Sequence, residues 1–417
     1  MLTRKLALVG AIGTVLALGL AGCSSGGSGG GSTGGASGGP SGDPIVLAGL
    51  GPLTGTLSAV GTDIQRGAEI AAKQINAKGG VLGRPLQVQM KDSAGGAQAA
   101  TQIVRDYINA GNPLIFGEVS SANCLAFAPV VDQLDGVYIA GACTNEGLTG
   151  ENGQPAPFAR TFRVGATSIQ DMIALTDTIV KKFPDVSTYD AFAFDYVSGH
   201  LQWQQFQDEA QKQGKPITPG QVFFVPLDAQ DYGSQISVLA QSSKEGANRG
   251  LYLGTYSSAT ASFFQQSAPY DYLKNYKVVV NPGGYYPIAR DLNGSAPEVW
   301  NGYDYNWSAY DSDMNKQFVD DFQAAYGYKP DTWAYQTYLA GLAYAAAIEK
   351  AGSADADAVA QALAGISFDS PQGEFTIDPV THKGNANIVI TDTVGDPNDP
   401  EKLKILSLTV VPYADAQ

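Results

Sequence analysis

Short apolar runs alternate with amphipathic segments through most of this chain, and this alternation restricts the fold more than any other feature. Residues 45–50 form the first apolar run and residues 86–90 the second. Between them, apolar side chains recur every three or four positions from Ile64 to Ile75, as in a helix with one buried face. The segment from Thr62 to Gln65 offers a capping box for its start. The repeated order of strand and helix predicts a parallel β-sheet covered by helices.

The same alternation starts again after residue 165. Further strands are expected at 191–195, 222–225, 251–254 and 278–280, with helices between them. The folded part starts near Asp43 and comprises about 375 of the 417 residues, which is more than one hydrophobic core usually serves. The sequence therefore predicts an α/β protein with two similar lobes and a cleft between them.

Residues 114–129 combine an apolar run, a break at Gly117, two serines and an alanine-rich segment. This order predicts a buried strand, a tight turn and the first turn of a helix. The free N–H groups at the helix start and the Ser121 hydroxyl would converge on a carboxylate or phosphate. The alternative is that Ser120 or Ser121 only caps the helix.

The first 22 residues have the order of a targeting segment. Arg4 and Lys5 precede an apolar stretch at 6–20, and Cys23 follows small residues. This resembles a bacterial lipoprotein signal peptide and implies an acylated Cys23 as the mature N-terminus. Residues 23–42 are almost wholly Gly and Ser, which predicts a flexible linker to a body held at the membrane by its lipid anchor.

The charge balance and the missing motifs exclude several classes of function. The net charge is −15, which argues against nucleic acid and anionic lipid surfaces as partners. Outside the Gly/Ser linker the sequence holds no Gly-x-Ser-x-Gly nucleophile elbow, and it holds no phosphate-binding P-loop and no HExxH zinc motif. Only His200 and His382 are available for histidine chemistry. We therefore expect no enzyme, no cofactor and no metal site.

Four segments in this order resemble those of the leucine/isoleucine/valine-binding proteins, which are type I periplasmic substrate-binding proteins of ABC transporters. They are GPLTG at 51–55, RGAE at 66–69, INAKGGVLGR at 75–84 and the Ser120-Ser121 turn. The resemblance implies two Rossmann-like lobes, joined by a three-strand hinge, with ligand in the cleft. It places lobe 1 at 43–164 plus 305–368 and lobe 2 at 165–304 plus 369–417. The crossovers are expected near 162–166, 303–307 and 368–373.

The resemblance also implies particular binding residues. The ligand carboxylate would meet Ser121, and the loop after the fourth strand would add Ala142 and Thr144. Tyr256 of the second lobe would close over the ligand. For Thr144 and Tyr256 the alternatives are an ordinary turn residue and a half-buried aromatic on the rim of the cleft.

The sequence departs from the amino-acid binders at two positions. Gly283 stands where they place a glutamate for the ligand ammonium, and Val60 replaces a tyrosine. A buried ammonium without a carboxylate is costly, so another acid substitutes or the ligand is not an α-amino acid. The candidate acids are Glu118, Glu146 and Asp195; an apolar or aromatic ligand would instead meet Tyr196, Trp203, Tyr285 and Tyr286.

Two cysteines remain once Cys23 is acylated. Cys124 and Cys143 lie within one to three residues of the expected ligand positions, on neighbouring loops. In an oxidising compartment this arrangement favours a disulfide that stiffens the pocket floor. The alternative is two buried free thiols.

The sequence thus predicts a monomeric, lipid-anchored solute-binding protein on the extracytoplasmic face of a bacterial membrane. It would bind a small amino-acid-like or carboxylate- or amide-bearing solute and deliver it to an ABC permease. A ligand-sensing lipoprotein of the same fold is the alternative, and a structural adhesin without ligand is a third interpretation.

Overall fold

The computed structural model describes residues 40–94, 96–246, 248–284 and 286–417. These residues belong to one compact unit. The predicted signal peptide, Cys23 and nearly all of the linker lie outside the described residues, as does Tyr285. Within the described ranges, no helix has both the length and the apolar character needed to cross a membrane.

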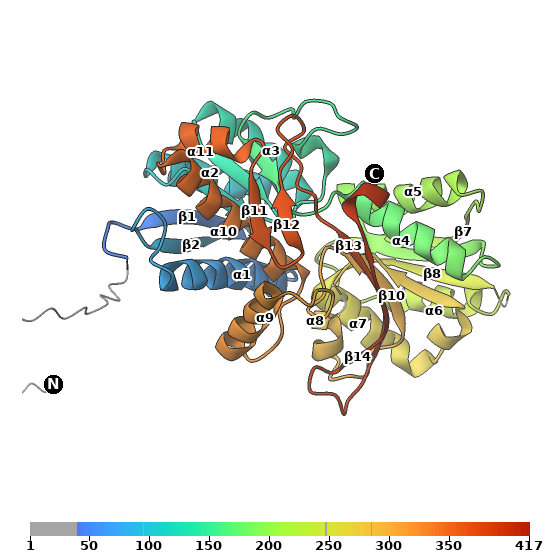
Figure 1. Cartoon of the computed structure of the whole chain (residues 1–417). Coiled ribbons are helices and arrows are strands. Elements are labelled where there is room, and N and C mark those ends of the chain that lie inside the picture. Colours follow the sequence, from blue (N-terminus) through green and yellow to red (C-terminus); the bar gives the residue numbers. More distant parts are fainter. Residues whose placement is uncertain (1–39, 95, 247, 285) are drawn as a thin grey trace, which may run out of the picture. The chain divides into compact units, whose positions relative to one another are not determined.

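The first sheet is five-stranded and wholly parallel, with the order β2-β1-β3-β4-β5 (Figure 1). Its strands are β1 (Ile45–Gly51), β2 (Leu86–Asp92), β3 (Leu114–Gly117), β4 (Val137–Ala140) and β5 (Thr161–Arg163). Its helices are α1 (Ser58–Ala77), α2 (Ala97–Asn109), α3 (Ser121–Gln133), α10 (Thr332–Ala351) and α11 (Ala356–Leu363).

Alternate residues of the first sheet enter two hydrophobic layers. Ile115 packs with α2 and α3, whereas Phe116 packs with α1 and α10. Both faces are apolar, because a parallel sheet is covered on both sides. Helix α1 starts at Ser58, one turn before the expected capping box, and the Thr62 hydroxyl instead donates to the Ser58 carbonyl within the helix, 2.8 Å.

The second sheet has seven strands in the order β14-β13-β10-β9-β8-β6-β7. Its strands are β6 (Thr188–Phe194), β7 (Thr218–Val225), β8 (Arg249–Gly254), β9 (Val278–Asn281), β10 (Val299–Tyr303), β13 (Ile388–Gly395) and β14 (Leu403–Val411). Strands β6 to β10 pair in parallel, whereas β13 runs antiparallel to both of its neighbours. Its helices are α4 (Ser168–Lys182), α5 (Val197–Lys212), α6 (Gly233–Ser242), α7 (Ser257–Ser267) and α8 (Tyr286–Asp291), and α9 (Asp313–Tyr326) follows β10. The predicted α/β class with two parallel-sheet lobes is confirmed.

The chain changes sheet after β5, after β10 and before β13. The third crossover expected at 368–373 is wrong. That segment forms a separate hairpin of β11 (Ser367–Ser370) and β12 (Gly373–Thr376). Lys383 still pairs with Arg163 of β5, so the chain reaches the second sheet only at Ile388.

Candidate functional site

The turn after β3 is shaped by a glycine and an acid. Gly117 has φ +96°, and a Cβ there would lie 2.4 Å from the Leu50 carbonyl oxygen. The Glu118 N–H donates to that carbonyl, 2.6 Å. Glu118 Oε1 accepts from the N–H groups of Val119 and Ser120, each 2.9 Å. Glu118 therefore holds the turn that starts α3, and its side chain does not line the cavity described below.

The two serines of this turn have different surroundings. Ser120 is the N-cap residue of α3 and lines the cavity. Ser121 is buried, and its Oγ accepts from Ser198 Oγ of α5, 2.8 Å. Since α5 follows β6 of the second sheet, this bond ties the two sheets together beside the cavity.

The loop after β4 brings Ala142 and Thr144 to the cavity wall. It is held by the buried guanidinium of Arg163, which donates to the Cys143 carbonyl and to the Asn145 carbonyl, the latter at 2.6 Å. Arg163 thus fixes the backbone on both sides of Thr144. A lone arginine in an apolar strand gives no sequence signal for this role.

The second sheet contributes the opposite wall. Tyr256 follows β8 and caps α7, and its hydroxyl donates to Gln202 Oε1 of α5, 2.5 Å. Burial raises the pKa of Tyr256 well above its usual value, so the phenol remains a donor at neutral pH. Tyr196 lies beside it at the start of α5 and also lines the cavity.

The cavity between these walls contains about 540 Å³ of empty space, part of it open to solvent. Its aromatic lining consists of Tyr196, Tyr256, Tyr303 and Trp333, and no Asp, Glu, Lys or Arg lines it among the described residues. Gln202, Tyr303 and Trp333 were not expected from sequence, because they arrive from separate helices and from a strand end. This lining is typical of a site for a small, largely apolar ligand with a few placed polar groups.

Two further acids from the sequence analysis lie elsewhere. Glu146 Oε1 accepts from Ser168 Oγ at 2.7 Å and from the Ile169 N–H at 2.8 Å. Asp195 pairs with His200 at the surface, 2.8 Å. Neither side chain lines the cavity. Trp203 is also absent from its wall, because its ring packs in the core against Phe206 and Tyr252.

Gly283 lies directly behind Tyr256. A Cβ at position 283 would come within 2.8 Å of the Tyr256 ring. A longer side chain there would displace the tyrosine from the cavity wall. The glycine and the tyrosine position are therefore coupled by packing.

Cys124 of α3 and Cys143 of the loop after β4 are brought together, with Cα atoms 6.6 Å apart. This separation falls in the range of protein disulfides. Over the described ranges, no group of three or more His, Cys, Asp and Glu side chains is arranged to hold a metal ion.

A family profile described as periplasmic binding protein matches residues 44–397, which include the whole first sheet, the second sheet except β14, and every residue of the cavity wall. The chain belongs to the periplasmic binding protein family. The resemblance recognised in the sequence is confirmed.

Curated relatives of this periplasmic binding protein cover most of its length. Leu/Ile/Val-binding protein homolog 7 of Brucella abortus is 28% identical over 351 residues, which cover 78% of this chain and 82% of that protein. The leucine-, isoleucine-, valine-, threonine- and alanine-binding protein of Pseudomonas aeruginosa is 24% identical over 363 residues and covers 80% and 86%. These relatives are binding proteins, so the prediction that the chain is not an enzyme is confirmed.

Solved structures share the fold of this periplasmic binding protein. A periplasmic binding protein from Burkholderia mallei has a TM-score of 0.75 at 17% identity, covering 90% of this chain and 96% of that one. An ABC-transporter solute-binding protein from Rhodopseudomonas palustris in complex with 3,4-dihydroxybenzoic acid has a TM-score of 0.74 at 22% identity, covering 88% and 98%.

Proposed function

We propose that this periplasmic binding protein is the solute-binding component of an ABC importer and that it binds a small carboxylate with an apolar or aromatic body. The observation that carries the proposal is the cavity whose walls come from both sheets, with an uncharged aromatic lining on one side and a helix start on the other. Relatives named for branched-chain amino acids and a neighbour bound to dihydroxybenzoic acid fall within this ligand class.

The carboxylate would lie at the start of α3. Free N–H groups in the first turn of a helix and the positive end of its dipole favour an anion there. The hydroxyls of Ser120 and Thr144 and the backbone of Ala142 border this end of the cavity. We assign Ser121 a contribution through its N–H in the first turn of α3, because its side chain is buried and does not line the cavity. Tyr256 would cover the apolar part of the ligand.

Ligand contacts on both walls would favour a closed arrangement of the two lobes, since closure brings together groups that an open form keeps apart. We place the lobe boundaries at 164/165 and 304/305, and the last one between Gly384 and Ile388. Ser121 and Ser198 would then form a polar contact that exists only in the closed form.

We further propose that Cys23 carries the lipid anchor, that the Gly/Ser linker lets a monomeric body reach its permease, and that Cys124 and Cys143 are bonded. Removal of the lipid anchor would release the protein from membranes and leave its ligand affinity unchanged.

A thermal-shift screen with leucine, phenylalanine, benzoate and 4-hydroxybenzoate tests the ligand class. A ligand present at 100 times its Kd should stabilise the protein by about 2.7 kcal/mol. Thr144→Val should weaken binding of the best ligand at least about tenfold, as expected for a lost hydrogen bond to a charged group.

Thr178→Val is the matched control, because the Thr178 hydroxyl donates to the Ala174 carbonyl within α4 and Thr178 lies outside the cavity. No stabilisation by any of these ligands, or equal effects of the two valine variants, would rule out the proposed site.

A further inference from the structure

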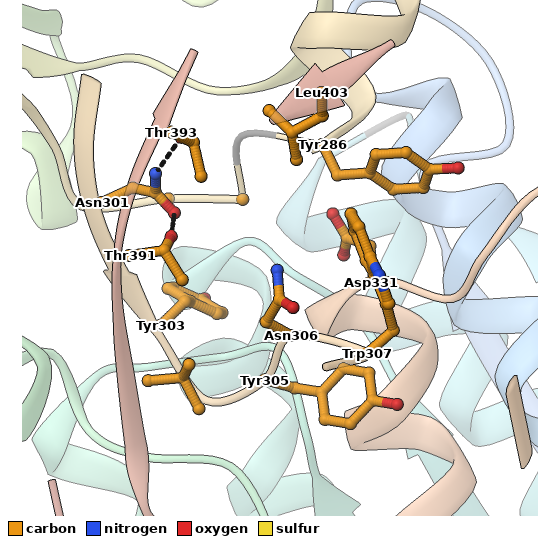
Figure 2. Close-up of a pocket in the computed structure, with 13 residues that line it drawn as sticks. Tyr286, Asn301, Tyr303, Tyr305, Asn306, Trp307, Asp331, Thr391, Thr393 and Leu403 are labelled. Carbon is orange, nitrogen blue, oxygen red and sulfur yellow. Dashed lines mark hydrogen bonds between the residues drawn. The ribbon is translucent and has the colours of Figure 1, made fainter. Parts of the chain in front are cut away.

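A second cavity adjoins the first, and one carboxylate faces it (Figure 2). It is bordered by Gly283 and Gly284, by alternate residues of β10 and β13, and by the segment from Tyr305 to Trp307. Asp331 is the acid in its wall, and Figure 2 shows its carboxylate, the Asn306 amide and the Tyr286 side chain around a common opening.

Only one of the two carboxylate oxygens of Asp331 has a hydrogen-bond partner among the described residues. Its Oδ1 accepts from the Trp333 N–H, 3.0 Å, and thereby caps α10. Its Oδ2 has no hydrogen-bond partner among the described residues, although the side chain is only 4% exposed. No ion pair with Asp331 occurs in the part of the chain that the structure describes. A buried carboxylate oxygen without a partner is costly, and a ligand can offset this cost.

The surroundings of Asp331 suit a cation. Tyr286 and Trp307 pack with ring centroids 4.5 Å apart and already lie beside cations of the protein, Arg290 at 5.3 Å and Lys329 at 5.4 Å from the respective ring centroids. Tyr303 and Tyr305 also line the cavity, and neither has such a cation among the described residues. Aromatic faces attract ammonium groups, and a carboxylate beside them adds a counter-charge. Asn306 contributes an amide oxygen that accepts hydrogen bonds.

The two cavities are separated by very little protein. Tyr303 lines both. Gly283 borders the second cavity and lies against Tyr256 of the first, whereas Trp333 of the first lies 3.3 Å from the position of a Cβ at Gly284. That same Cβ would lie 2.7 Å from Asp331 Oδ2, so the glycine pair leaves room for the acid.

We propose that Asp331 is the counter-ion for a protonated nitrogen of the ligand, taking over the role of the acid that is missing at Gly283. The inference rests on the proposed function, because it assigns the second cavity to the same ligand. The ligand is then a zwitterion, with its carboxylate at α3 and its ammonium group toward Asp331. This carboxylate comes from the start of α10, 48 positions after Gly283, which is why the motif around residue 283 does not reveal it.

The charges around Asp331 predict that ligand affinity depends on pH. Burial and the neighbouring Asp63 raise the pKa of Asp331 to about 8, while the Trp333 N–H and Arg290 lower it. Asp331 is therefore largely protonated at pH 7 without ligand. Binding of an ammonium group favours the ionised form and releases a proton, so affinity for an amine-bearing ligand rises from pH 6 to pH 8.

Paired ligands test the assignment in the mature protein. Leucine is compared with 4-methylpentanoate, and phenylalanine with 3-phenylpropanoate, by isothermal titration. The wild type should bind the amine-bearing member at least about tenfold more tightly, consistent with an ion pair taken out of water. Asp331→Asn should abolish this preference and keep the affinity for the acid without an amine. Titration in two buffers of different ionisation enthalpy should show proton release only for wild type with the amine-bearing member.

The variants are chosen so that a folding defect is visible. Asparagine remains a good N-cap residue for α10, and retained binding of the amine-free acid reports an intact first cavity. Asp195→Asn is the control, because this surface acid lies outside both cavities. If the acids bind but the amine adds nothing, or if the preference survives in Asp331→Asn, the inference is wrong and the proposed function stands. If no member of either ligand pair binds, both the inference about Asp331 and the proposed function are wrong.

Discussion

Asp190 joins several elements of the second lobe through one carboxylate. It is fully buried and accepts from Arg249 Nη1 at 2.8 Å, from the Gln221 N–H at 2.7 Å and from Ser242 Oγ at 3.0 Å. The Tyr276 hydroxyl donates to its other oxygen, 2.7 Å. The structure satisfies this acid completely, in contrast to Asp331.

Removing the Asp190 carboxylate should therefore strongly lower the stability of the second lobe. Asp190→Ala leaves the mostly buried Arg249 guanidinium with only the exposed Glu245 as an ion-pair partner and leaves the Tyr276 hydroxyl without its acceptor carboxylate. We expect a loss of about 3 kcal/mol in the free energy of unfolding. Urea denaturation measures it. Asp311→Ala, at an exposed ion pair with Lys316, is the control and should leave the midpoint unchanged. Equal effects of the two variants would contradict the assignment.

Arg163 should affect ligand binding although its side chain does not line the cavity. Arg163→Lys keeps the charge but cannot reach the carbonyls of Cys143 and Asn145 together, since an ammonium group is a single compact donor centre. We expect about tenfold weaker ligand binding through a displaced Thr144. Calorimetric titration measures the affinity. A variant that loses stability but binds normally would show that Arg163 supports only the fold.

Individual residues of the ligand site could be predicted from the sequence only where they belong to a recognisable motif. Ala142, Thr144 and Tyr256 were expected near the ligand, and the structure brings all three to one cavity. Gln202 and Trp333 were missed because no local pattern tells which face of a helix end meets a cleft. Asp331 was missed for the same reason.

Helices α1 and α10 approach each other at two glycines. A Cβ at Gly67 would lie 1.9 Å from the Ala334 carbonyl oxygen, and a Cβ at Gly341 would lie 2.6 Å from the Ala71 Cβ. The pair of helices buries most of one face of the first sheet (Figure 1). Small residues at these points allow the close contact.

Gly67→Ala should destabilise the first lobe although alanine favours helices. The added methyl group would force the helices apart at a cost of about 1–3 kcal/mol, which exceeds the gain of roughly 1 kcal/mol in helix propensity. Thermal unfolding tests this. Gly246→Ala is the control, because a Cβ there meets nothing within 4 Å. A more stable Gly67→Ala variant would contradict the packing argument.

A disulfide between α3 and the loop after β4 should stabilise the first lobe. A bond between Cys124 and Cys143 spans 19 positions and should contribute about 3 kcal/mol through loop entropy. We expect no thiol to react in the unfolded, unreduced mature protein, and we expect Cys124→Ser with Cys143→Ser to unfold at lower urea concentration. Two reactive thiols would show that the cysteines are free.

Most elements could be predicted because strand and helix periods differ clearly. The expected strands at 191–195, 222–225, 251–254 and 278–280 overlap β6, β7, β8 and β9. No strand was expected at β10 or β13, although the chain does change sheet after β10, where a crossover was expected near 303–307. Both strands lie at the junction of the lobes, where pairing with distant segments outweighs local pattern.

Across the whole molecule, buried acids make stability depend on pH. Burial raises the pKa of Asp63 to about 6, despite a hydrogen bond from Tyr328, and that of Asp331 to about 8, from an ordinary value of 3.8. A raised folded pKa gives stability that is complete below the unfolded pKa and is lost as pH rises through the folded pKa. The window therefore runs from about pH 4 to about pH 8.

We expect the free energy of unfolding to be larger at pH 5 than at pH 8. The Asp63 shift alone corresponds to about 3 kcal/mol. Below pH 4 the trend reverses, because Asp321, whose pKa is lowered by its hydrogen bond from Lys73, loses its charge. Urea unfolding across this range measures the profile. Asp63→Asn with Asp331→Asn should reduce its slope without removing it, because burial also raises the pKa values of Asp304 and Asp392 to about 6. A flat wild-type profile would contradict the assignment.

The position of β13 sets the order in which the molecule can be completed. This strand lies between β10 and β14, yet it is made from residues near the end of the chain. During synthesis from the N-terminus, all five strands of the first sheet are complete after residue 163. One edge of β10 stays unpaired until β13, which begins at residue 388, has been synthesised. Pairing over such sequence separations is slow. The second lobe is therefore the last part to acquire its native edge, and a nascent or truncated chain exposes that edge to chaperones and to other strands.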